Sequence, residues 1–111
     1  MLALTLNTRI FLCKEPTDMR KSYDGLMYLV QNHFNQNPLS GDFFVFVNRN
    51  KNRMKILFWE TGGFCLFCKR LEKGRFKFPE GESIQIDKII LSMILDGIDF
   101  SSIKRLPRYT P

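Results

Sequence analysis

Four short apolar runs between residues 43 and 78 constrain the fold of this chain more than any other feature. Residues 43–48, 54–60, 64–71 and 75–78 are rich in Phe, Val, Ile and Leu, which favour β-strands. The segments between them are short and contain Gly, Asn and charged residues, which is typical of hairpin turns. The pattern predicts consecutive antiparallel strands, a β-meander.

Shorter strands and a first helix are predicted outside the meander. Residues 9–13 and 84–86 are apolar enough for short strands. Between the first strand and the meander, apolar residues recur at the helical period through residues 23–34. This helix begins between Thr17 and Ser22, either of which is a suitable N-cap.

A second helix is predicted near the C-terminus. Asp87 is a suitable N-cap for it, and Gly97 suits the left-handed conformation that often ends a helix. The apolar face of this helix consists of Ile90, Leu91, Ile94 and Leu95.

The chain length of 111 residues fits one domain. We predict a single α+β domain over residues 1–100, with an antiparallel meander sheet of about four to five strands and two helices. Residues 101–111 are polar and contain proline, so we expect them to form a mobile tail.

The positive charge is concentrated in one quarter of the chain. Residues 49–77 hold nine Lys or Arg and two Glu, whereas the remaining residues hold eight basic and nine acidic side chains. The net charge is +6, and such a balance favours an acidic partner, nucleic acid above all.

Alternating cations in this region predict a phosphate-binding surface. If the two basic turns are neighbours, their charges form one stripe, which can neutralise a phosphate backbone. The alternative is a solvated sheet edge, where Lys and Arg discourage edge-to-edge pairing. A further cationic pair lies at the start of the first helix, where it opposes the helix dipole and where Asp18 is placed to offset it. The predicted set is Arg20, Lys21, Arg49, Lys51, Arg53, Lys55, Lys69, Arg70, Lys73 and Arg75.

The cysteine pair Cys65 and Cys68 has the spacing C-x-x-C, which raises a zinc site as an alternative. A structural zinc site needs four ligands, and only Cys13 and His33 remain as candidates. Residues three apart on a strand also point to opposite faces. We therefore interpret the cysteines as small buried hydrophobic residues and expect no metal.

Aromatic residues of the meander have two interpretations. Trp59, Phe58, Phe64 and Phe67 are suited to stacking on unpaired bases, but strands of this length need a buried face, so we expect these residues in the core. His33 lies on the predicted apolar face of the first helix, and we interpret it as a core or boundary residue.

Nothing in the sequence indicates an enzyme. The single His, the scattered acidic residues and the lack of nucleophile, P-loop or Rossmann motifs predict no catalytic residue and no cofactor. No apolar run is long enough to span a membrane. The odd, small number of cysteines fits a reducing compartment, so we expect a cytoplasmic protein.

Two segments resemble a known bacterial family. The first is Thr17-Asp18-Met19-Arg20-Lys21, and the second is Lys69-Arg70-Leu71-Glu72 followed by Gly74-Arg75-Phe76. In this order and spacing they resemble the small accessory protein of IS66-type insertion sequences, also called TnpB-like or the Orf2 product. The resemblance covers about residues 9–100.

The resemblance implies a role in transposition beside a separate catalytic transposase. It implies two partners, the DNA of the element ends and the transposase, and it leaves homo-oligomers open. We predict an accessory protein that binds DNA non-specifically through its basic sheet and turn surface. The alternative is a protein–protein adaptor that docks on the transposase without contacting DNA.

Overall fold

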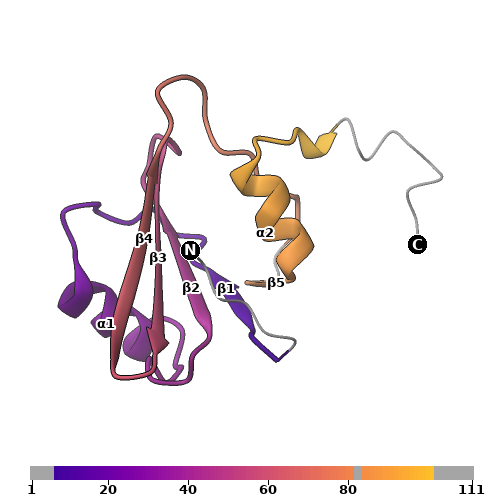
Figure 1. Cartoon of the computed structure of the whole chain (residues 1–111). Coiled ribbons are helices and arrows are strands. Elements are labelled where there is room, and N and C mark those ends of the chain that lie inside the picture. The colour runs from indigo at the N-terminus through magenta and orange to yellow at the C-terminus, as the bar shows by residue number, and fades with distance from the viewer. Residues whose placement is uncertain (1–6, 82–83, 102–111) are drawn as a thin grey trace.

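The computed structural model describes residues 7–81 and 84–101 (Figure 1). Five strands form one sheet in the order β4-β3-β2-β1-β5, and two helices accompany it. In chain order the elements are β1 (Ile10–Leu12), α1 (Tyr23–Asn32), β2 (Phe43–Val47), β3 (Arg53–Glu60), β4 (Gly63–Arg70), β5 (Gln85–Ile86) and α2 (Lys88–Leu95). The predicted α+β class, strand number and helix number are confirmed.

The sheet is mixed. Strands β2, β3 and β4 form the predicted antiparallel meander, and β5 pairs antiparallel with β1. Strand β1 instead runs parallel to β2, because α1 carries the chain from one end of the sheet back to the other. A parallel neighbour needs such a crossover, and the meander prediction did not include this pair.

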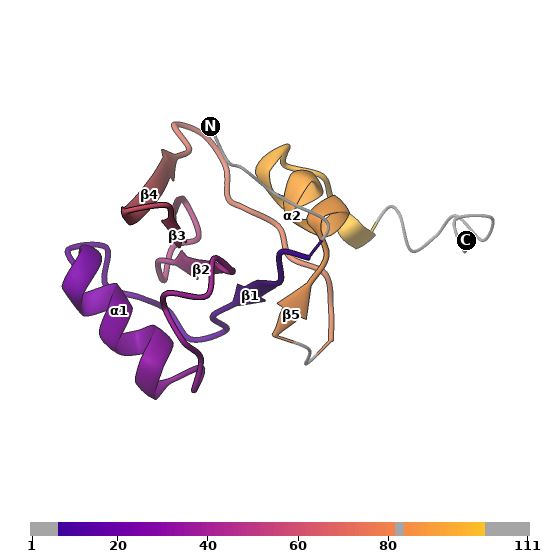
Figure 2. The same cartoon turned by 60° about the horizontal axis from the view of Figure 1, so that its bottom comes forward.

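Each helix covers a different face of the sheet (Figure 2). On the α1 side, Leu26 and Val30 pack with sheet residues such as Phe44. On the α2 side, Leu91 and Ile94 pack on the opposite side of the same strands. All five residues of β2 are buried, as expected for a central strand with both faces covered.

The boundaries of α2 follow the predicted local chemistry. The Asp87 side chain accepts a hydrogen bond from the Ile90 amide at 2.8 Å. At the other end, Gly97 has a φ of 75°, and the amides of Gly97 and Ile98 donate to the carbonyls of Ile94 and Met93. This double hydrogen-bonded end is a Schellman motif.

The predictions for residues 75–78 and for His33 were wrong. Residues 75–78 form no strand, because this segment leaves the sheet and its Phe76 packs into the α2-side core. His33 is exposed at the C-cap of α1, because the neighbouring Phe34 takes the buried position in the α1-side core. The predicted mobile tail lies almost wholly outside the described residues. No helix in the described ranges has the length and apolar character needed to cross a bilayer.

Candidate functional site

The two basic turns lie side by side at one end of the sheet (Figure 1). The amide of Leu71 donates to the carbonyl of Asn52 at 2.8 Å, and the amide of Phe76 donates to the carbonyl of Lys51 at 2.7 Å. The Phe76 side chain is only 1% exposed. The segment after β4 is therefore fixed against the β2–β3 turn, which brings the cations of both turns together.

Asn48 organises the β2–β3 turn. Its Oδ1 accepts hydrogen bonds from the amides of Asn52 and Arg53, each at 3.0 Å. Its Nδ2 donates to Asn52 Oδ1 at 2.7 Å. Lys51 has a left-handed backbone with a φ of 59°, which is uncommon for a residue with a side chain. In this turn the Lys51 carbonyl becomes the acceptor for the next basic segment.

Seven exposed cationic residues surround these turns, and we call them the basic end. Within the described ranges, Arg70 is the only one of the seven with an acidic partner. The field of the group therefore remains open to an anion. The basic end consists of Arg49, Lys51, Arg53, Arg70, Lys73, Arg75 and Lys77.

Arg53 and Arg70 stand directly opposite each other on β3 and β4. Like charges in this relation destabilise a sheet. Arg70 Nε lies 2.9 Å from Glu72 Oε2, but the two side chains are 60% and 77% exposed, and exposed pairs contribute at most about 1 kcal/mol. Both arginines line a hollow of about 500 Å³. An anion held there would relieve their repulsion.

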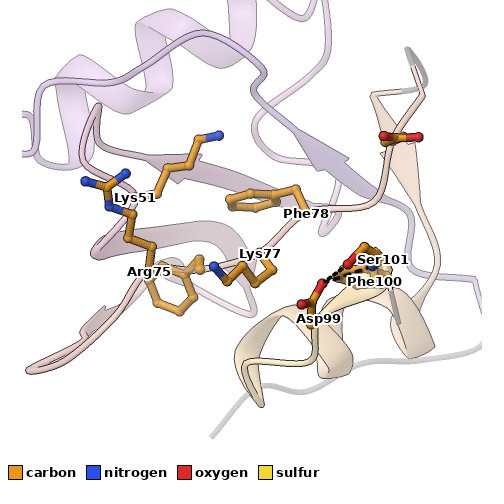
Figure 3. Close-up of a pocket in the computed structure, with 9 residues that line it drawn as sticks. Lys51, Arg75, Lys77, Phe78, Asp99, Phe100 and Ser101 are labelled. Carbon is orange, nitrogen blue, oxygen red and sulfur yellow. Dashed lines mark hydrogen bonds between the residues drawn. The ribbon is translucent and has the colours of Figure 1, made fainter. Parts of the chain in front are cut away.

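Two cavities adjoin the basic end and meet at the contact between Lys51 and Phe78. The larger, of about 390 Å³, has Arg75 and Asp99 in its lining (Figure 3). The smaller, of about 280 Å³, includes Arg49. The Lys51 ammonium lies 5.8 Å from the centroid of the Phe78 ring, within cation–π range. An aromatic side chain in contact with one cation thus lies between two hollows.

Two cations near these cavities stand outside the predicted set. Lys77 lines the larger cavity, and its alternation with Lys73 and Arg75 was the signal that pointed to it. Lys14 lines the smaller cavity, and its Nζ donates to the Gly81 carbonyl at 3.0 Å. Lys14 carries no local signal, because only the fold brings it to this place.

Two predicted cations have structural partners. Lys55 Nζ donates to the carbonyls of Met19 and Lys21 at 2.8 and 2.7 Å. Lys69 Nζ donates to the Leu95 carbonyl at 2.9 Å, at the end of α2, where a cation favours the helix dipole. Lys55 thus connects the sheet to the segment before α1, and Lys69 connects it to the end of α2. Their predicted contact with phosphate stays a prediction, and the basic end is defined without them.

Arg20 and Lys21 precede α1 rather than lying within it. The Asp18 carboxylate accepts hydrogen bonds from the Arg20 amide and guanidinium, the shortest at 2.7 Å. These hydrogen bonds and the adjacent positive charge lower the pKa of Asp18 to about 2. Asp18 thus offsets the Arg20 charge as expected, whereas no acidic side chain in the described ranges pairs with Lys21.

The three cysteines occupy different environments. Cys65 is partly buried on the α2 side, opposite Phe58, whereas Cys68 is exposed on the α1 side, opposite Lys55. The predicted opposite orientation is confirmed, but the prediction that Cys68 is buried was wrong, because α1 does not cover this end of β4. Cys13 is buried, and burial raises the pKa of its thiol.

The aromatic residues of β3 and β4 are graded in burial. Phe58 is buried and Phe67 packs partly against the α2-side core. Trp59 and Phe64 stack edge to face at 5.0 Å and are partly exposed. Within residues 7–81 and 84–101, no three His, Cys, Asp or Glu side chains are grouped so as to hold a metal ion.

The fold and site define a class of protein: a small α+β domain with a helix on each sheet face and cations gathered at one sheet end. Residues 8–105 match the family described as IS66 Orf2 like protein, and the chain belongs to this family. The family resemblance predicted from the sequence is confirmed. Membership indicates an accessory role associated with transposition.

Two proteins of Sinorhizobium fredii (strain NBRC 101917 / NGR234) are similar to this chain over most of their length. Uncharacterized protein y4hO is 40% identical, and the match covers 90% of this chain and 89% of y4hO. Uncharacterized protein y4jC is 30% identical, and the match covers 100% of this chain and 97% of y4jC. No solved structure matches the chain.

Proposed function

We propose that this protein is a non-catalytic accessory factor that binds the DNA backbone through the basic end and thereby assists a separate transposase. The observation that carries the proposal is the hydrogen-bonded contact between the two basic turns, which gathers seven exposed cations at one end of the sheet. A protein that neutralises phosphates releases their bound counterions, and this drives association.

The opposed pair Arg53 and Arg70 supports the same role. A sheet gains nothing from two like charges directly across from each other. Such local conflicts are typical of positions kept for function. Contacts to phosphate position a protein on DNA without reading its sequence, so the proposal includes weak sequence preference.

The salt dependence of binding tests this proposal. A labelled duplex carrying an element end and an unrelated duplex of equal length are titrated with protein at several salt concentrations. If about five phosphates are neutralised, the slope of log K against log salt is about −4.5. We expect that slope for both duplexes, with similar affinities. A slope near zero contradicts backbone binding.

A matched pair of charge reversals locates the site. Arg75→Glu and Lys88→Glu change the net charge equally, but Lys88 lies at the start of α2, beside β5 and away from the basic turns (Figure 1). We expect Arg75→Glu to weaken binding and to reduce the salt slope by about one or more. Lys88→Glu should bind as the wild type does. Equal losses for both variants would show that only net charge matters.

The alternative is an adaptor that docks on the transposase without contacting DNA. The half-buried Phe78 beside Lys51 favours it, because aromatic anchors among polar neighbours are typical of protein interfaces. Capture of the purified transposase by wild-type protein, lost in Arg75→Glu, together with no shift of either duplex, would support the adaptor and reject DNA binding.

A further inference from the structure

Strand β4 forms an open edge of the sheet. It has eight residues and pairs with β3 on one side, and no strand within the described ranges pairs with its other side. The opposite edge, β5, has only two residues. An open strand presents unpaired amide and carbonyl groups that can template another strand.

The side chains of β4 lack the usual protection of such an edge. Residues 64–68 read Phe-Cys-Leu-Phe-Cys, with no charge and no proline, and four of the five are partly buried within the protomer. Natural edges carry Lys, Pro or a bulge to prevent pairing. On β4 the cations come only at the end of the strand, at Lys69 and Arg70.

The hairpin geometry determines which backbone groups face outward. Glu60 pairs with Gly63 across the two-residue turn of Thr61 and Gly62. In such a hairpin the closing pair is hydrogen-bonded, and the character of the pairs then alternates along the ladder. The amides and carbonyls of Phe64, Leu66 and Cys68 therefore point away from β3 and are available to another strand.

A second β4 fits this edge in one register better than in its neighbour. With a two-fold axis at Leu66, Leu66 lies opposite its own copy and Phe64 lies opposite Cys68 of the other protomer. All outward groups then pair, and apolar side chains meet apolar side chains. Moving the axis to Phe67 would place Arg70 opposite Phe64, which leaves a charge against an aromatic ring.

The ends of the two strands also fit this register. It places Lys69 of one protomer opposite Gly63 of the other, and Gly63 is itself opposite Glu60. Because Gly63 has no side chain, it does not collide with Lys69, whose ammonium stays on the Leu95 carbonyl of its own protomer.

We propose that two copies of this chain pair through antiparallel β4 strands, with the two-fold axis at Leu66, so that their sheets join into one. This proposal rests on the edge of β4 and does not require that the protein bind DNA. The interface is isologous, as is usual for homodimers. Pairing of the two β4 strands would satisfy the outward amides and carbonyls of an edge that is otherwise prone to aggregation.

Sedimentation equilibrium of the wild-type protein and of Leu66→Lys tests the pairing. We expect a dimer for the wild type and a monomer for Leu66→Lys, because the new ammonium groups would lie directly opposite each other. Far-UV circular dichroism checks that the variant is folded. A wild-type protein that stays monomeric up to its solubility limit overturns the proposal.

Disulfide trapping tests the register and does not depend on how the lysine variant folds. In a Cys65→Ser/Cys68→Ser background, Leu66→Cys should form a disulfide-linked dimer under mild oxidation, because paired Cα atoms about 5.5 Å apart suit a disulfide. Phe64→Cys should crosslink only when Cys68 is retained. The control is Thr61→Cys in the same background, in the exposed turn. Equal crosslinking of Thr61→Cys and Leu66→Cys overturns the register.

Discussion

The amide of Phe76 donates to the carbonyl of Lys51, and this hydrogen bond joins the segment after β4 to the β2–β3 turn. The Phe76 ring is buried in the α2-side core, whereas the Phe78 ring is only partly buried. We expect Phe76→Ala to lower the free energy of unfolding by about 3–5 kcal/mol, because it leaves a cavity in the core. Urea denaturation measures the loss. Phe78→Ala is the control and should cost clearly less; equal losses would mean that Phe76 is not the anchor.

Lys69 connects the sheet to the end of α2 through the Leu95 carbonyl. Lys69→Met keeps most of the aliphatic stem but removes the donor and its interaction with the helix dipole. We expect the free energy of unfolding to fall by about 1–2 kcal/mol. Lys73→Met, in the exposed loop, should change it by less than about 0.5 kcal/mol. If the two variants are equally stable, the Lys69 contact contributes nothing measurable.

The elements that were predictable depend on local chemistry. The Asp87 cap and Gly97 end of α2 need only the residues beside them. The hairpin turns likewise follow from Gly and Asn between apolar runs. The clustering of cations at these turns was also predictable from the local sequence, because every cation of the basic end lies in or next to a turn.

The features that were not predictable depend on residues distant in the sequence. Lys55 binds the carbonyl of Met19, 36 residues away, and Lys69 binds one 26 residues away. Nothing in either local sequence distinguishes these lysines from the cations of the basic end. The alternation of polar and apolar residues in 75–78 was compatible with a strand. In the structure Phe76 is instead buried in the α2-side core, and the segment makes no strand pairing.

The contribution of the Asp42 carboxylate to the free energy of unfolding should depend on pH. Burial of Asp42 raises its pKa, but the hydrogen bonds from Arg9 and Ser40 outweigh burial and leave the pKa below its usual value. The carboxylate therefore stabilises the fold above its unfolded pKa of about 3.9, and this contribution is lost as the pH falls through the lower folded value.

Asp42→Asn tests this linkage. At neutral pH we expect a loss of about 1–3 kcal/mol, since the Arg9 guanidinium loses its charged acceptor. The difference from wild type should begin to shrink below about pH 4, where the carboxyl becomes protonated in the unfolded chain, and should shrink further as the pH falls through the lower folded pKa. Urea denaturation at neutral and acid pH measures both values. Glu15→Gln, at an exposed position, should show no such trend. A difference that is constant with pH would exclude the ionised carboxylate as its cause.

Thiol labelling should separate the cysteines by their environment. Cys68 is exposed, whereas Cys13 is 6% exposed and burial raises the pKa of its thiol. Because the thiolate is the reactive form, we expect an alkylating reagent to modify Cys68 rapidly in dilute native protein and Cys13 only after unfolding. Cys68→Ser should remove the rapid phase, and Cys13→Ser should leave it unchanged. Rapid modification of Cys13 in native protein would mean that the junction between β1 and the segment leading to α1 opens readily.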